Sequence, residues 1–201
     1  MKKRKEVATD SNDQNYFKQF WAFLKKDSWG SLIVTLIIAF IVIKYIFFPG
    51  LSLLTGTSLP LVIVESCSMY HPDGGFEKIL ENDIYAQNGI SIENTTDWIF
   101  PSGFSKGDVI FVVAVDEPEI GDVIIFNGGA SHPLIHRVID VDGAYGTKGD
   151  NYKTNTGQLP AERAISEEQI IGKAVFRIPF IGWAKLFFFE WGRPASQRGM
   201  C

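Results

Sequence analysis

Two serines, Ser66 and Ser68, lie two residues apart in the segment VIVESCSMYHP, which spans residues 62–72. An apolar run at residues 61–64 leads into the short polar turn that contains them. A serine becomes a nucleophile only when a base takes its proton and hydrogen-bond donors wait for the oxyanion of the substrate. The chemistry of these serines therefore depends on whether the chain supplies a base.

His136 is the best candidate for that base among the three histidines of the chain. In the segment HPLIHRVIDV, the two-residue period of a strand places His136 on one face with Leu134 and Val138. Apolar neighbours desolvate an imidazole and keep it neutral, as a base must be. On this pattern alone, a structural core histidine that bonds a backbone carbonyl is the more common outcome. The other two histidines, His71 and His132, are weaker candidates by context.

An acidic side chain is needed to orient the imidazole. Asp150, in the segment TKGDN, is one candidate, and Asp140 and Asp142 lie nearer to the histidine in sequence. By itself, Asp150 is typical of a turn. The two cysteines, Cys67 and Cys201, indicate neither a disulfide scaffold nor a metal site, and no HExxH-like spacing occurs. We therefore expect no metal and no cofactor, and the cysteines leave the redox compartment open.

The first element that must position these residues is a membrane anchor. Residues 32–48, LIVTLIIAFIVIKYIFF, are apolar on all sides, and residues 29–31 extend them to about the 20 residues that cross a bilayer. A buried core helix, the alternative, is usually apolar on one stripe only. Seven Lys and Arg residues precede the run and none follows it until Lys78, so the positive-inside rule places the N-terminus in the cytoplasm.

The chain before the apolar run is expected to stay in the cytoplasm. Its polar N-terminal region is too long for a cleaved signal peptide, and no clear A-x-A cleavage pattern follows the run. Residues 1–15 are charged and poor in aromatic side chains, which is typical of a disordered tail. We therefore expect a cytoplasmic tail over residues 1–28 and a transmembrane helix over residues 29–50.

The rest of the chain, residues 51–201, is expected to be a mostly β domain outside the cytoplasm. Its apolar runs are short and β-branched, and Gly-Asp, Asn-Gly and Asp-Gly turn signals separate them. One exception is GGFEKILENDIYAQNG, where apolar residues recur at helical spacing. This segment predicts a helical insertion at about residues 71–105.

The overall composition excludes one class of partner. The chain has a net charge of −4 and a sequence pI of about 5.4, whereas a nucleic-acid-binding protein carries a surplus of Lys and Arg. With 201 residues, it has room for one domain of ordinary size together with an anchor or a tail. We therefore expect no nucleic-acid partner and no second globular domain.

Six segments, taken in order, resemble the type I signal peptidase family. They are the N-terminal transmembrane helix, ESCSMYHP (similar to the S-x-S-M-x-P box), KGDVIFV with IGDVIIF, PLIHRVI, TKGDN and IIGKAVFRIPFIGW. The resemblance runs from the anchor through Ile178 and is broken by one long insertion. Bacterial-type members carry a lysine before the arginine of the PLIHRVI strand, whereas archaeal and endoplasmic-reticulum-type members carry a histidine. The pair His136–Arg137 therefore resembles the second, Ser-His group.

The resemblance implies a role for each candidate residue. Ser68 corresponds to the nucleophile and His136 to the general base, which favours catalysis over a structural core histidine. Ser66 resembles the side chain that holds the oxyanion together with the backbone N–H of Ser68. Asp150 corresponds to the aspartate of the family's G-D-N box.

The sequence departs from the family pattern at three places. Two residues rather than one separate Met69 from Pro72, and Cys67 stands where the family has a small glycine. Endoplasmic-reticulum-type members carry a second aspartate shortly after the G-D-N box, as a proposed triad acid, whereas this chain has Asn155 and Thr156 there. The identity of the acid is therefore open between Asp150 and another aspartate.

The resemblance implies a membrane-anchored serine endopeptidase that removes N-terminal signal peptides from exported preproteins. It would act at the outer face of the cell membrane or in the endoplasmic reticulum membrane, and would cut after small residues at the first and third positions. Its expected partners are signal peptides, the lipid bilayer and the protein translocation machinery. A soluble self-processing peptidase of the repressor type is an alternative that the apolar segment disfavours. A non-catalytic membrane-tethered β domain, binding exported proteins or a partner subunit, is a second alternative, favoured by the missing aspartate.

Overall fold

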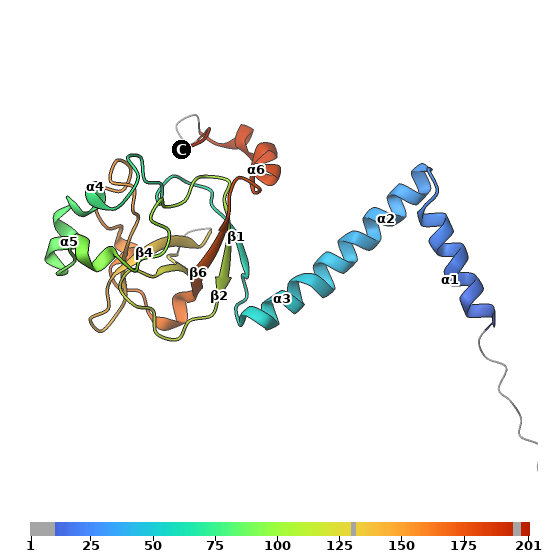
Figure 1. Cartoon of the computed structure of the whole chain (residues 1–201), viewed down its shortest axis with the longest axis horizontal. Coiled ribbons are helices and arrows are strands. Elements are labelled where there is room, and N and C mark those ends of the chain that lie inside the picture. The colour runs from blue at the N-terminus through green and yellow to red at the C-terminus, as the bar shows by residue number, and fades with distance from the viewer. Residues whose placement is uncertain (1–10, 130–131, 195–197) are drawn as a thin grey trace, which may run out of the picture. The chain divides into compact units, whose positions relative to one another are not determined.

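The computed structural model describes residues 11–129, 132–194 and 198–201, and these described residues fall into two compact units that divide between residues 50 and 51. Figure 1 gives the order of their elements. The helical segments of the first part of the chain are α1 (Ser11–Leu24), α2 (Trp29–Val42), a π-helical turn (Ile43–Phe47) and α3 (Phe48–Thr55). Ser28 caps α2, because its side chain accepts a hydrogen bond from the backbone N–H of Ser31.

One stretch of the described residues, Trp29–Thr55, is long and apolar enough to cross a membrane, judged by its length and composition. Of the tail predicted to be disordered, residues 1–10 lie outside the described residues, whereas residues 11–15 belong to α1. The disorder prediction is therefore wrong for this second part. Aromatic side chains at helical spacing follow immediately, and the rings of Phe17 and Trp21 stack one turn apart, at 6.4 Å between centroids.

The second unit is built on one six-stranded antiparallel sheet with strand order β1-β2-β6-β3-β4-β5 (Figure 1). The strands are β1 (Leu61–Ile63), β2 (Val109–Val113), β3 (Val123–Phe126), β4 (Leu134–Asp140), β5 (Gly146–Lys148) and β6 (Ile170–Ile178). Register shifts interrupt three of the strand pairs, and such bulges bend and twist a sheet. The predicted mostly β character of this region agrees with the sheet.

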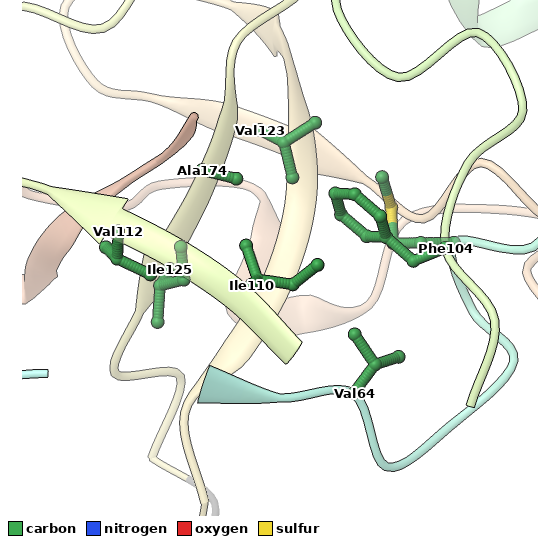
Figure 2. Packing of buried hydrophobic residues seen from close by; sticks show 8 residues of the cluster. Val64, Phe104, Ile110, Val112, Val123, Ile125 and Ala174 are labelled. Atoms are coloured by element: carbon green, nitrogen blue, oxygen red, sulfur yellow. The ribbon is translucent and has the colours of Figure 1, made fainter. Parts of the chain in front are cut away.

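Both faces of the sheet are covered, because alternate side chains of its central strand enter two different cores. Val123 and Ile125 pack in a cluster that also contains Val64, Met69, Phe104, Ile110, Val112 and Ala174 (Figure 2). Ile124 and Phe126 pack on the other face with Val138 and Ile165. The period of two in the sequence thus directs neighbouring residues of β3 to opposite sides.

The segment between residues 71 and 105 contains two short helices, α4 (Glu77–Leu80) and α5 (Asp83–Gln87), and a 3-10 turn (Ile92–Thr95). The sequence predicts one helix here, but Asn82 interrupts it, since its side chain accepts a hydrogen bond from the N–H of Ile84 and caps α5. A third apolar cluster, Phe76, Ile79, Tyr85, Ile90 and Ile139, fixes the segment on β4. Helix α6 (Trp183–Phe189) follows β6.

Candidate active site

Ser66, Ser68 and His136 line one pocket of about 230 Å³. Its other walls come from β1, the residues that follow β1, the start of β4 and α6: Leu59, Leu61, Val62, Ile63, Glu65, His132, Pro133, Leu134, Ile135 and Lys185. The structure therefore brings together three of the four predicted site residues, although the serines precede the histidine by about seventy positions.

The turn that carries the two serines is fixed by backbone contacts. The hydroxyl oxygens of Ser66 and Ser68 are 3.1 Å apart and share a hydrogen bond. Asn151 donates its backbone N–H to the carbonyl of Ser68 at 2.8 Å and its side-chain amide to the carbonyl of Cys67 at 2.8 Å. A Cβ on Gly149 would lie 2.8 Å from the Ser68 carbonyl oxygen, so only glycine allows this close approach. The predicted G-D-N box thus braces the turn that carries the two serines.

His136 lies on β4, opposite Ile124 of β3, and is only 2% exposed. Its Nδ1 contacts the Oε1 carboxylate oxygen of Glu162, a buried residue of the 3-10 turn Pro160–Glu162. A carboxylate beside Nδ1 favours the tautomer with its hydrogen on that nitrogen and its lone pair on Nε2. Among the described residues, no hydrogen bond involves Nε2 of His136. This arrangement favours the tautomer that can accept a proton from the pocket.

Asp150 does not meet this histidine. Its fully buried carboxylate accepts hydrogen bonds from Arg137 Nε at 3.1 Å, from Arg137 Nη2 at 2.7 Å and from His71 Nε2 at 2.9 Å. Burial alone would raise the pKa of Asp150, but the Arg137 charge and the hydrogen bonds lower it to about 2. Because Arg137 and His136 are consecutive on β4, their side chains point to opposite faces of the strand.

The expected contact between Asp150 and the imidazole of His136 is therefore not formed in the structure, because the carboxylate bonds Arg137 and His71 on the other face of β4. The two alternative aspartates do not reach His136 either. Asp140 accepts a hydrogen bond from the backbone N–H of Asp142 at 3.1 Å, within a turn, and Asp142 is exposed.

Sequence reasoning missed Glu162, which lies in the segment QLPAERA. Its signals were weak, because the proline two residues earlier and the glutamate together form an ordinary helix-start pattern. It also missed a disulfide between Cys67 and Cys201, whose positions are 134 residues apart.

Among the described residues, no group of three or more His, Cys, Asp or Glu side chains is arranged to hold a metal ion.

The remaining predicted histidines have other surroundings. His132 lines the pocket beside Pro133. His71 is buried on the far face of β4, where its Nδ1 donates to the backbone carbonyl of Pro101 at 2.8 Å and its Nε2 meets Asp150.

No model of a protein family matches the chain. It is similar to proteins named signal peptidase complex catalytic subunit, SEC11, from several eukaryotes. The chain is 31% identical over 98 residues to the protein of Pyricularia oryzae, covering 43% of the chain and 57% of that relative. It is 30% identical over 98 residues to the protein of Dictyostelium discoideum, covering 44% and 55%. A longer match, 27% identical over 158 residues, covers 73% of the chain and 76% of the protein of Lachancea thermotolerans.

These similarities place the chain among relatives of catalytic peptidase subunits, although the first two matches span little more than half of the relatives' lengths. They confirm the resemblance to the type I signal peptidase family that the six motifs indicate.

Proposed function

We propose that this protein is a membrane-anchored serine endopeptidase that removes N-terminal signal peptides from exported preproteins. The observation that carries the proposal is the pocket that Ser66, Ser68 and His136 line together, with Glu162 in contact with Nδ1 of the histidine. Similarity to catalytic subunits of signal peptidase complexes supplies the reaction class.

In the proposed mechanism, Ser68 Oγ attacks the scissile carbonyl while His136 Nε2 takes its proton. Glu162 stabilises the imidazolium that forms, through its contact with Nδ1. The hydroxyl of Ser66 and the backbone N–H of Ser68 hold the oxyanion. His136 then protonates the leaving amine, and water releases the acyl-enzyme by the same route.

Asp150 has a different proposed role in this site. It fixes Arg137, the neighbour of the base on β4, and it stands between the two residues, Gly149 and Asn151, that brace the nucleophile turn. We propose that Asp150 positions the catalytic groups through Arg137 and the serine turn, and that it takes no part in proton transfer.

The sheet suggests how a signal peptide would bind. Among the described residues, strand β1 pairs with β2 alone and leaves its other edge open, and the residues of β1 line the pocket. An extended peptide can add to such an edge as a further strand. In a strand, the first and third side chains before the cut point the same way, so both would face this small pocket. That geometry favours small residues at these two positions.

The anchor and the disulfide support the proposed location. The helical run Trp29–Thr55 contains the proposed membrane-spanning segment, residues 29–50, with residues 1–28 in the cytoplasm and residues 51–201 outside. Disulfides persist in oxidising compartments, which agrees with the Cys67–Cys201 pair on the outer side. Signal peptides and lipid are the proposed partners, together with further subunits, as in the complexes for which the relatives are named, and the translocation machinery.

Cleavage of a preprotein by the detergent-solubilised full chain tests the proposal. The wild type is expected to release the signal peptide, whereas Ser68→Ala and His136→Ala are expected to release almost none. Undiminished cleavage by either variant would overturn the mechanism. Binding of preproteins without any cleavage by the wild type would favour the non-catalytic alternative. That alternative loses its motivation from the missing aspartate, because Glu162 supplies an acid for the histidine.

A further inference from the structure

The last residues of the chain contact the nucleophile turn in a way that the mechanism above does not use. We call residues 190–194 and 198–201 the C-terminal strap. Its Cys201 forms a disulfide with Cys67, the residue between the two site serines. Its Arg193 donates from Nη1 to the carbonyl of Glu65 at 3.0 Å and pairs through Nη2 with the Glu65 carboxylate at 2.5 Å. The strap therefore holds the turn by one disulfide, one ion pair and one hydrogen bond to the backbone.

The strap is itself fixed on the domain. Glu190 accepts a hydrogen bond from the N–H of Gly199 at 2.8 Å, which closes the strap into a loop. The same carboxylate pairs with the buried Lys106 Nζ at 2.6 Å. The backbone N–H of Lys106 lies 3.2 Å from the Cys201 sulfur, so the disulfide rests against the loop that precedes β2. A strap anchored at both of its ends can limit the movement of the turn.

The turn is thus held from two sides. Asn151 bonds the carbonyls of Cys67 and Ser68 from one side, and the C-terminal strap holds Glu65 and the Cys67 side chain from the other. Ser66 and Cys201 are both exposed, so a thiol reductant has access to the disulfide. Reduction would release one of the two supports and leave the other in place.

We propose that the Cys67–Cys201 disulfide and the C-terminal strap position the two site serines, so that cleavage falls when the disulfide is reduced. Cys67, Cys201 and Arg193 are positioning residues in this proposal, which rests on the proposed peptidase function. In the reduction, a dithiol supplies two electrons and two protons. The S–S bond breaks, two cysteine thiols form, and the dithiol becomes a disulfide. Reoxidation restores the support.

The main experiment compares oxidised and reduced forms of the same full-length protein in detergent. Dithiothreitol is added and removed, and the number of thiols is counted by alkylation and mass spectrometry. We expect reduction to lower preprotein cleavage at least about tenfold, mainly in kcat, because small misplacements of a nucleophile are costly. Oxidised glutathione should restore it. Two free thiols in the untreated protein would overturn the proposal, as would equal cleavage by the two forms.

Variants separate the disulfide from other effects of the reductant. Cys201→Ser is expected to cleave slowly with or without dithiothreitol. Arg193→Gln keeps the disulfide and is expected to show a smaller loss, which Arg193→Lys partly restores. Lys78→Gln, which removes an exposed charge on α4, serves as the matched control and should behave as the wild type. An effect of dithiothreitol on Cys201→Ser as large as on the wild type would contradict the proposed role of the disulfide.

A second readout does not depend on cleavage. The amide hydrogens of Tyr70 and Asn151 are bonded to the carbonyls of Cys67 and Ser68. Both are expected to exchange with deuterium about tenfold faster after reduction, because local opening of the turn exposes them. If neither form cleaves any preprotein but exchange rises on reduction, the peptidase function fails and the positioning stands. If the oxidised form cleaves and reduction changes neither readout, the positioning fails and the function stands.

Discussion

Two histidines of this protein are buried against a carboxylate, and the proposed function gives a catalytic role to only one of them. His71 is 4% exposed and His136 is 2% exposed. His71 meets Asp150, and His136 meets Glu162. The difference lies in the second nitrogen of each ring. In His71 that nitrogen faces the carbonyl of Pro101, whereas in His136 it belongs to a ring that lines the pocket of the two serines.

This comparison shows which feature separates a structural imidazole from a base. Both nitrogens of His71 lie within hydrogen-bond distance of protein oxygens, so neither of them is open to a serine hydroxyl. The ring also packs edge-on against Phe76, with 5.2 Å between centroids. Burial and a carboxylate partner are common to the two sites. The two sites differ in the second ring nitrogen. His136 lines a pocket together with two serine hydroxyls, whereas both nitrogens of His71 have protein partners.

Replacing each histidine tests the comparison most strongly. We expect His136→Ala to lower preprotein cleavage by about 10³- to 10⁴-fold, because a general base contributes about that much, with little change in the folded state. His71→Asn should retain cleavage within about tenfold but lower the free energy of unfolding by about 1–3 kcal/mol, the usual cost of an unsatisfied buried partner. Cleavage rates and thermal unfolding of the two purified variants decide the matter. A folded His71→Asn protein without activity would contradict the assignment.

Replacing each acid asks which carboxylate supports the base. Glu162→Gln is expected to lower kcat by about 10²- to 10⁴-fold with little change in KM, since the amide no longer stabilises the imidazolium. Glu162→Asp should recover part of that loss. Asp150→Asn is expected to act mainly on stability, by about 3–5 kcal/mol, because it leaves the buried Arg137 without its counter-charge.

The matched control for the acid is Glu168→Gln, which changes an exposed glutamate in the next 3-10 turn and should leave kcat unchanged. A normal kcat for Glu162→Gln would mean that Glu162 is not the acid that supports His136, and Asp150 would again be the candidate.

Replacing Ser66 tests its proposed role in holding the oxyanion. Ser66→Ala is expected to lower kcat by about 100- to 1000-fold, the usual effect of losing one oxyanion donor. It should remain more active than Ser68→Ala, because it keeps the proposed nucleophile, the Ser68 hydroxyl, together with the backbone N–H of Ser68. Single-turnover cleavage of a preprotein measures both variants. Equal activities for the two would mean that Ser66 also fixes the nucleophile, to which its hydroxyl is bonded at 3.1 Å.

The sequence was sufficient where a regular pattern dictates structure. The short β-branched runs and the turn signals between them predicted a mostly β domain, and β2, β3 and β4 form from such runs, because alternation and turn signals are local. The same alternation placed His136 with Leu134 and Val138, and the structure packs both of these apolar residues in one core on that face. Strand β5, Gly146–Lys148, was missed, since three residues without apolar alternation carry no such signal.

The parts that sequence could not supply depend on contacts between distant residues. Glu162 contacts His136 across 26 positions, and the chain offers many glutamates of similar local character. The Cys67–Cys201 disulfide requires the last residue of the chain to return to the serine turn. The sequence motif identified Asp150 but not its partner. Only the fold shows that Asp150 pairs with Arg137, whose side chain lies on the face of β4 opposite to His136.

The smallest expected effect is the pH dependence of stability that comes from Asp150, the carboxylate partner of His71. The pKa of Asp150 is lowered from 3.8 to about 2, so its ionised form is favoured by folding. The contribution to stability, about 2 kcal/mol by linkage, is fully present above pH 4 and is lost as the pH falls toward 2. The difference in unfolding free energy between the wild type and Asp150→Asn should therefore shrink by about that amount between pH 5 and pH 2. Asp142→Asn, an exposed change, should show no such convergence. If the unfolding free energy of Asp150→Asn stays below that of the wild type by the same amount from pH 5 to pH 2, the ionisation of Asp150 does not stabilise the folded protein. The contact between His71 and Asp150 would then not depend on the charge of the carboxylate.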